Sequence, residues 1–415
     1  MMVSRCSIGD DAPGFPSQLR PCYPTLATQQ QVDAAQAHIH NVAVDNQTFQ
    51  KIGAPMANLF IPVLACSLLQ AGQITTFAGT GQTGYSGDGG PATQARFSQP
   101  FLCTTDIRGG LFVADALNHC IRYIDGKTGI CTTVVGTGQK GYTGDGGQAI
   151  KATLNEPYAI VLDEQQNLYI VDRLNAAIRR VEARTGVITT LAGTGVKGFA
   201  GDGGPATQAQ FREPNDCFLD GKGGLLVADV ADWRIRRIDL RTGSVSTFAG
   251  VGKPADRKLA RSSGDGGPAL QAVLAGARAV CVDGKGNAYI CEREGNVVRK
   301  VDSAGLITTV AGTGTKGYSG DGGAPLRATL NGPKGLRCDL GGNLLIADCE
   351  NHAIRKVDFD QKKITTIAGG RKGSGGDNGP AVHAELNRPH GCIMDKEGTL
   401  IICDSENFRV RKVAP

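Results

Sequence analysis

The stretch GTGQTGYSGDGG at residues 79–90 decides the fold, because it recurs along the chain. Its first six residues match G-x-G-x-x-G, the fingerprint of dinucleotide-binding loops, which needs a strand before it and a helix after it. The segment that follows, PATQARFSQP at residues 91–100, has a proline at each end and is too short for such a helix. A cofactor loop is also needed only once, so repetition of this stretch indicates a structural role.

Six versions of the glycine stretch divide the chain into units. Close copies stand at residues 136–147, 193–204 and 312–323, and looser copies, SSGDGGPA and GSGGDNGPA, stand at 262–269 and 373–381. Their aspartates lie 56 to 63 residues apart, at Asp88, Asp145, Asp202, Asp265, Asp321 and Asp377. Recurrence at a nearly fixed spacing is typical of solenoids and propellers, in which each unit is one supersecondary element.

Each unit contains four short apolar runs separated by polar turns. In the second unit they are EPYAIVLD (156–163), NLYIVD (167–172), AIRRVE (177–182) and VITTLAG (187–193). Runs rich in Val, Ile, Leu and Thr between Gly, Asp and Asn indicate strands, and none holds a helical apolar period. Four antiparallel strands per unit, repeated six times, predict an all-β, six-bladed β-propeller.

The two ends of the repeat region complement each other. The last unit ends with its third strand, FRVRKVAP (408–415), and lacks a fourth. The missing run, QITTFAG, stands before the first glycine stretch, from Gln73 to Gly79. We therefore expect this N-terminal strand to complete the last blade and close the ring, which removes the unpaired sheet edges of an open array.

The second and third runs of each unit share one motif. It reads GLFVADALNHCIR (110–122), NLYIVDRLNAAIR (167–179), LLVADVADWRIR (225–236), NAYICEREGNVVR (287–299), NLLIADCENHAIR (343–355) and TLIICDSENFRVR (399–411). This pattern resembles the NHL-repeat family, over residues 73–415. The resemblance implies a propeller fold. It leaves the function open, because NHL-like propellers include protein-binding modules, RNA-binding modules and sensor ectodomains, and related six-bladed propellers include lyases and lactonases.

Two domains are expected, a propeller at residues 73–415 and an N-terminal extension at residues 1–72. The extension begins with a Pro-, Gly- and Ser-rich segment typical of disorder. Residues 39–46 and 57–72 fit a decayed repeat, and the apolar run in 57–72 also fits a signal-like segment. That run is short for a membrane span, so no transmembrane segment is predicted.

The cysteines and charges bear on the compartment and on partners. The chain has thirteen cysteines, and five of them (Cys103, Cys217, Cys291, Cys392 and Cys403) occupy positions where other repeats have small apolar residues, which indicates buried thiols. The odd number and unclustered spacing of the cysteines slightly favour an intracellular protein over a secreted one. The net charge of +5 comes without a long basic run, so nucleic acid remains a partner that is not favoured.

One acidic position is repeated in every unit at the end of the second run. A residue present in all six equivalent places indicates a structural role. We expect these acids to accept backbone N–H groups at the turn after the second strand, beside an equally repeated arginine. The acids are Asp115, Asp172, Asp229, Glu292, Asp348 and Asp404, and the arginines are Arg122, Arg179, Arg236, Arg299, Arg355 and Arg411.

A neighbouring position varies instead of repeating. It begins the first strand of each unit, and antiparallel pairing places it at the same rim as the acids, near the axis. In chain order it holds Phe101, Tyr158, Asn215, Arg278, Lys334 and His390, with Asp216 following Asn215. Aromatic, amide, acidic and cationic groups around one opening suit a ligand with a polar or anionic group and an apolar body. Free drift of exposed positions is the alternative explanation.

We therefore expect a non-catalytic propeller that binds a protein or small ligand at its central mouth, and no cofactor. One alternative is a propeller lyase or hydrolase with a divalent cation at the mouth: calcium held by Asn215 and Asp216, or zinc. The repeats offer no second mouth histidine beside His390 for a three-histidine zinc site. The other alternative is an RNA-binding module using Arg278, Lys334, Phe101 and Tyr158.

Overall fold

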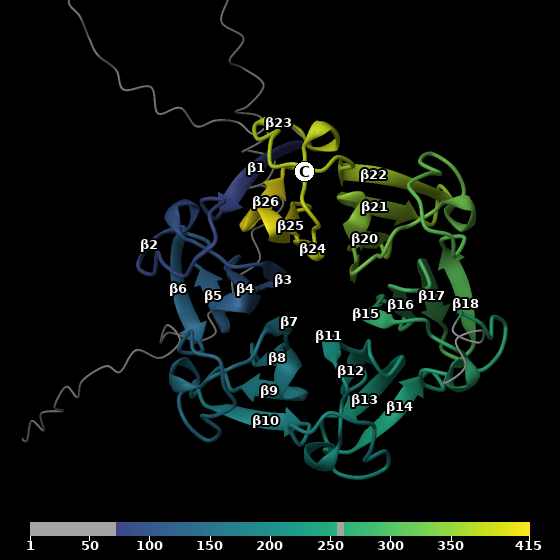
Figure 1. Ribbon diagram of the computed structural model, residues 1–415, viewed down its shortest axis with the longest axis horizontal. Coiled ribbons are helices and arrows are strands. Elements are labelled where there is room, and N and C mark those ends of the chain that lie inside the picture. Colours follow the sequence, from purple (N-terminus) through teal and green to yellow (C-terminus); the bar gives the residue numbers. More distant parts are fainter. Residues whose placement is uncertain (1–71, 255–260) are drawn as a thin grey trace, which may run out of the picture. The chain divides into compact units, whose positions relative to one another are not determined.

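The computed structural model describes residues 72–254 and 261–415. The strands of these ranges form six sheets, four of four strands and two of five, and the sheets follow one another around a central axis (Figure 1). The expected six-bladed, all-β propeller is confirmed. The proposals for the N-terminal extension fall on residues outside the described ranges, apart from Gly72.

Each blade runs antiparallel from the axis outward, so that the first strand of a unit is innermost and the fourth is outermost (Figure 1). Blade 1 contains β3 (Pro100–Thr105), β4 (Leu111–Asp115), β5 (Cys120–Ile124) and β6 (Ile130–Val135). Blade 2 contains β7 (Pro157–Leu162), β8 (Leu168–Asp172), β9 (Ala177–Val181) and β10 (Ile188–Ala192). Blade 3 contains β11 (Pro214–Leu219), β12 (Gly224–Asp229), β13 (Arg234–Asp239) and β14 (Val245–Ala249).

The remaining blades repeat this order. Blade 4 contains β15 (Ala277–Val282), β16 (Ala288–Glu292), β17 (Val297–Val301) and β18 (Ile307–Ala311). Blade 5 contains β19 (Gly335–Cys338), β20 (Leu344–Asp348), β21 (Ala353–Asp358) and β22 (Lys363–Gly369). Blade 6 contains β24 (Gly391–Met394), β25 (Leu400–Asp404) and β26 (Arg409–Val413), completed by β1 (Gln73–Ala78).

The ring closes through β1. This strand pairs antiparallel with β26, with Ile74 opposite Val413 and Thr76 opposite Arg411. The short strands β2 (Gly90–Pro91) and β23 (Gly379–Pro380) extend the outer edges of blades 1 and 6. Closure therefore uses the chain end that the repeat pattern predicts.

The helices of the described ranges are short 3-10 turns of three residues. One set follows the glycine stretches: η1 (Ala92–Gln94), η3 (Ala149–Lys151), η5 (Ala206–Gln208), η7 (Ala269–Gln271), η8 (Pro325–Arg327) and η10 (Ala381–His383). The other set joins second to third strands: η2 (Ala116–Asn118), η4 (Arg173–Asn175), η9 (Cys349–Asn351) and η11 (Ser405–Asn407). In this part of the chain no helix is long and apolar enough to cross a membrane.

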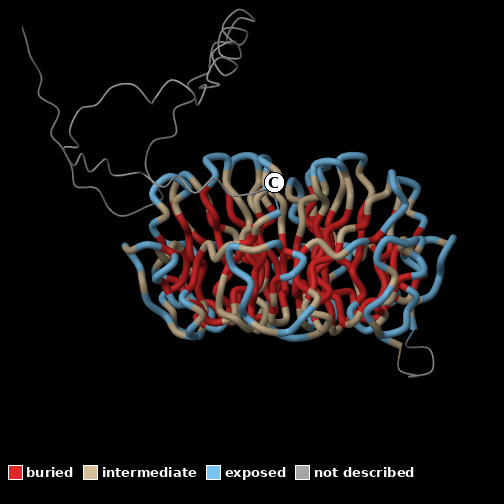
Figure 2. The backbone as a smooth tube through the Cα atoms, turned by 90° about the horizontal axis from the view of Figure 1, so that it is seen from above, coloured by how far each residue is buried: buried red, intermediate tan, exposed pale blue. Residues whose placement is uncertain are grey.

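The buried residues fill the middle of the ring, and the turns at its two edges are exposed (Figure 2). The core lies between blades, where the faces of successive sheets meet. One cluster joins Phe97 and Val113 of the first unit to Ile401 and Val410 of the last, and the others combine successive blades in the same way. The ten cysteines of the described ranges are free thiols, and all but Cys338 are buried. They pack as small hydrophobic groups.

The glycine stretches turn the chain tightly from one blade to the next. Gly144 has φ +94°, and a Cβ on it would lie 2.6 Å from the Cβ of Ala152. Both the left-handed backbone and the close approach require glycine at this position. The stretches are therefore blade connectors, as their repetition predicts.

Candidate functional site

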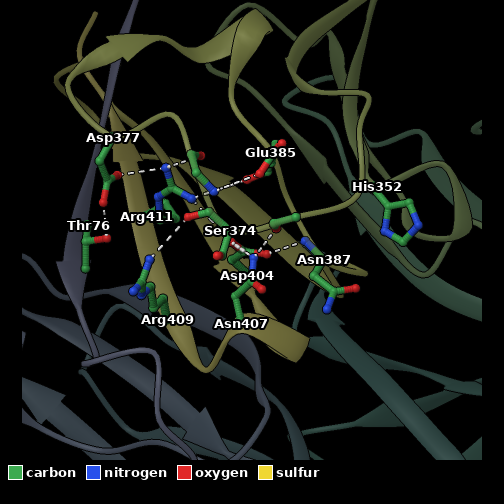
Figure 3. A network of polar contacts seen from close by, with 12 residues as sticks. Thr76, His352, Ser374, Asp377, Glu385, Asn387, Asp404, Asn407, Arg409 and Arg411 are labelled. Carbon is green, nitrogen blue, oxygen red and sulfur yellow. Dashed lines mark hydrogen bonds and ion pairs between the residues drawn. The ribbon is translucent and has the colours of Figure 1, made fainter.

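The repeated acids and arginines form one buried network in each blade, shown for blade 6 in Figure 3. Arg411 extends from β26 and bonds Asp377 of the glycine stretch at 2.7 Å and the ring acid Asp404 at 3.4 Å. The six equivalent arginines, which we call the repeat arginines, are 0–1% exposed and bond their glycine-stretch aspartates at 2.5–2.8 Å. The glycine-stretch aspartates therefore hold an arginine as well as a turn.

The ring acids bond the turn after the second strand, mostly through an asparagine side chain, and also a second segment that was not expected. Asp404 accepts the backbone N–H of Asn387 at 2.7 Å and the Nδ2 of Asn407 at 2.8 Å. Asn387 belongs to the link that leads into the first strand, and this link lies against the end of the second strand. In blade 3, Asp229 also accepts the N–H of Asp232 in the turn itself. The acids thus fasten the link, and through it they position the residues at the start of the inner strand.

The variable positions lie where the six inner strands begin, and five of them contact another member of the set. We call the following side chains the mouth residues: Phe101, Tyr158, Asn215, Asp216, Arg278, Lys334 and His390. Tyr158 is half-buried, and the other six are more than nine-tenths buried. They are therefore packed against one another, and free drift of exposed positions does not describe them.

Aromatic rings form one side of the mouth. Phe101 stacks on Tyr158 with ring centroids 4.0 Å apart, and the edge of His390 meets Phe101 at 4.1 Å. The guanidinium of Arg173, from η4, lies 4.4 Å from the Tyr158 ring centroid on top of this stack. Stacked rings capped by a cation form a stiff apolar wall.

His390 and Lys334 form a fixed pair. The Nδ1 of His390 donates to the carbonyl oxygen of Arg388 at 2.9 Å, which leaves Nε2 to accept from the Lys334 ammonium at 3.2 Å. Burial and the positive charge of Lys334 hold the pKa of His390 well below its ordinary value, so the imidazole is neutral. Lys334 also bonds Glu350 at 3.3 Å.

An ion pair ties three blades together beneath the mouth. Asp216 on β11 accepts both Nη groups of Arg337 on β19, at 2.8 and 2.9 Å. Its oxygens also accept the N–H groups of Cys217 and Val280, the latter from the intervening blade. Each oxygen of Asp216 therefore has two donors, and the calcium alternative would require this pair to open.

Arg278 is the one arginine among the mouth residues, and it differs from the repeat arginines. It is 8% exposed, and within residues 72–254 and 261–415 it has no hydrogen bond or ion pair. Its guanidinium makes a cation–π contact with the Tyr158 ring, whose centroid lies 5.3 Å away. Glu213, whose pKa Arg278 helps to lower, pairs with Arg173 at 2.6 Å instead. Burial lowers the pKa of Arg278, although a guanidinium stays charged.

Ion pairs that the sequence did not reveal form the rim. Arg173 bonds Glu156 at 2.5 Å and Glu213 at 2.6 Å. Arg388 bonds Glu350 at 2.7 Å and lies 3.5 Å from Glu406. These residues stand directly before the inner-strand proline or one to two positions after the ring acid, and these positions also vary between repeats. Variation at these positions was the signal that could have identified them.

The histidines of the repeated motif join adjacent blades. The Nδ1 of His119 accepts the N–H of Glu156 from the next blade at 3.1 Å, and His352 accepts the N–H of Arg388 in the same way. Asn296 does this with its side-chain oxygen for Gly332 at 2.9 Å. In the described ranges no group of three or more His, Cys, Asp or Glu side chains is placed to hold a metal ion.

The comparisons with known proteins agree with this architecture. No protein-family model matches the chain. It is 26% identical over 333 residues to Protein SUPPRESSOR OF QUENCHING 1, chloroplastic, of Arabidopsis thaliana, covering 75% of this chain and 30% of that protein. It is 33% identical over 190 residues to NHL repeat-containing protein 2 of Bos taurus, covering 43% of this chain and 26% of that protein. The chain thus spans less than a third of either relative.

A solved structure shows the same fold. An auxiliary nutrient binding protein from Bacteroides thetaiotaomicron superposes with a TM-score of 0.58 and 19% identity. The superposition covers 82% of this chain and 76% of that one. At this identity the likeness concerns the fold alone.

Proposed function

This chain belongs to the NHL-repeat β-propellers, and we propose that it is a non-catalytic binding module whose mouth residues recognise a protein or a small ligand. A single observation carries the proposal. Six equivalent positions meet at the axis and hold six different residue types, while the acid and arginine beside them repeat in every blade. The repeated residues stabilise the scaffold, and the variable residues differ at one opening. Such an arrangement is suited to selecting a ligand at that opening.

The contacts of the mouth support binding over catalysis. A general base or nucleophile needs a lone pair available to its substrate. Both nitrogens of His390 are engaged, one with the Arg388 carbonyl and one with Lys334. Asp216, the acid of this group, already accepts four hydrogen bonds. Among the described residues, the Nε of Arg278 and the amide oxygen of Asn215 are buried without a partner, and such groups suit recognition.

The proposal is tested by ligand-observed NMR on the full chain, with a set of neutral, cationic and anionic small molecules. Asn215→Ala and Arg278→Gln change the mouth, and Lys300→Gln removes a charge from β17 in the same blade as Arg278, away from the mouth. We expect at least one compound whose binding weakens about tenfold or more in both mouth variants, which corresponds to about 1.4 kcal/mol, and is unchanged by Lys300→Gln. Binding that none of the mouth substitutions changes would contradict a recognition role for the mouth.

A further inference from the structure

Two buried polar groups of the mouth lack partners, and they lie in neighbouring blades. The Nε of Arg278 is buried without a partner, as in several repeat arginines, but unlike theirs its Nη groups have no hydrogen bond or ion pair in the described part of the chain either. The Oδ1 of Asn215 is also without a partner there, and its orientation is fixed because Nδ2 donates to the Glu213 carbonyl at 2.8 Å. Such groups are costly to bury, and in a native structure each needs an explanation.

Lys334 brings a second positive charge to the same place. It precedes β19, whose blade is next to that of Arg278, and after burial the charge of Arg278 is among the causes that lower its pKa. Its ammonium is held by His390 at 3.2 Å and by Glu350 at 3.3 Å. Glu350 is shared with Arg388, which also lies 3.5 Å from Glu406, so Lys334 has one carboxylate partner and Arg278 has none. The pair Arg278 and Lys334 therefore carries an excess of positive charge.

The groups around this pair add two further features. Tyr158, stacked on Phe101, supplies an aromatic face beside Arg278. The amide oxygen of Asn215 offers an acceptor. A cationic pair, an aromatic face and one acceptor thus stand within the same ring of inner-strand termini.

We propose that the mouth binds a small organic oxyanion, with a carboxylate or phosphate group between Arg278 and Lys334 and a hydroxyl or amino group on the same molecule donating to Asn215. This inference rests on the binding role proposed above and names its ligand class. An oxyanion would supply the acceptors that the guanidinium lacks, and charge-assisted bonds of this kind are the strong ones. His390 acts through Lys334, because its neutral Nε2 orients the ammonium.

The burial of the site favours a small molecule over a peptide. Arg278 and Lys334 are each 8% exposed, and the rim pairs of Arg173 and Arg388 stand around them. A compact anion reaches groups at this depth without displacing the rim, whereas a folded partner could contact only the rim itself. An acidic peptide is accordingly an outcome of the test and not part of the proposal.

The binding test uses thermal unfolding of the full chain with inorganic phosphate, acetate and glycolate, because a ligand of the native state raises the unfolding temperature. Glycolate differs from acetate by one hydroxyl group. We expect a rise with at least one probe, a larger rise with glycolate than with acetate, and a binding constant at least about tenfold weaker in Arg278→Gln and Lys334→Gln. Asn215→Ala should remove the preference for glycolate, and Lys300→Gln should change none of these results.

A second readout needs no ligand. Arg278→Gln removes an uncompensated buried charge, so the ligand-free variant should unfold at a higher temperature than the ligand-free wild type. A structural role for Arg278 predicts the opposite, and a lower unfolding temperature would overturn the proposal.

The outcomes separate this inference from the function on which it rests. A neutral or cationic compound that binds through the mouth, with no response to any of the three oxyanions, would overturn the ligand class and leave the binding role standing. An acidic peptide whose binding requires Arg278, with no response to the small anions, would replace the small molecule by a protein ligand. Loss of all mouth-dependent binding would remove both proposals.

Discussion

The repeat arginines and Arg278 are almost equally buried, yet their surroundings are opposite. Each repeat arginine bonds a glycine-stretch aspartate, and in five of the six blades it also bonds the ring acid. Arg278 has neither kind of partner in the described ranges. A buried charge with partners is part of the architecture, whereas a buried charge without them adds free energy to the ligand-free fold. The comparison therefore separates arginines that stabilise the fold in every blade from Arg278, an arginine that occurs in one blade and does not stabilise the ligand-free fold.

The largest effect is expected from removing an arginine that is paired with two carboxylates. Arg355 bonds Asp321 at 2.7 Å and Asp348 at 3.5 Å and also donates to two backbone carbonyls. Arg355→Met would leave Asp348 buried without its counterion, and removal of one partner of such a pair costs about 3–5 kcal/mol. Urea-induced unfolding should show a loss of this size in the free energy of unfolding.

The control is Arg327→Met, which removes an exposed arginine from the same blade and should change the free energy of unfolding by less than about 0.5 kcal/mol. Arg278→Met should move stability in the opposite direction from Arg355→Met. If Arg355→Met cost no more than Arg327→Met, the distinction between arginines paired with carboxylates and the unpaired Arg278 would have no energetic basis.

A smaller effect is expected from pH, at the ring acid of blade 1. Burial raises the pKa of Asp115 to about 7, although Asn118, the Ser98 N–H and Arg122 all lower it. The folded pKa lies above the unfolded value, so protonation favours the folded state. This contribution is complete at low pH and is lost as the pH rises through 7. Between pH 6 and 8 it amounts to about 1.4 kcal/mol, from one proton over about one pH unit.

The measurement is the free energy of unfolding of the wild type and of Asp115→Asn at pH 6, 7 and 8. Asn cannot titrate, so the decline toward pH 8 should be shallower in the variant by about that amount. The ring acids Asp172, Asp229, Asp348 and Asp404, whose pKa values burial raises to about 6, keep a decline in both proteins. Identical slopes would show that Asp115 is ionised throughout this range.

The features that could be predicted from the sequence are those that recur in every repeat. Six copies revealed the blades, the closing strand, the glycine turns and the ring of acids and arginines, because each feature recurs at a fixed offset. The positions of the mouth residues followed from the same alignment. Their partners did not, because contacts such as Asp216 with Arg337 join residues 121 positions apart in different blades. No periodicity encodes which variable side chains meet, so the packing of the mouth and the isolation of Arg278 required three-dimensional coordinates.

The smallest expected effect concerns the contact between blades 1 and 2 at the rim. His119 accepts the N–H of Glu156, a residue with φ +54° directly before a proline, where this backbone conformation is unfavourable. Loss of the acceptor in His119→Ala should cost about 1 kcal/mol in the free energy of unfolding. His119→Asn should restore most of this stability, because Asn296 in blade 4 accepts the N–H of Gly332 in the same way. The control is His383→Ala, which changes an exposed histidine.

Equal losses in His119→Ala and His119→Asn would mean that the ring packing of His119, and not its hydrogen bond, joins the blades. Recovery in the Asn variant would show that this hydrogen bond is a structural contact, like those of the repeat arginines, although its residue type varies from blade to blade.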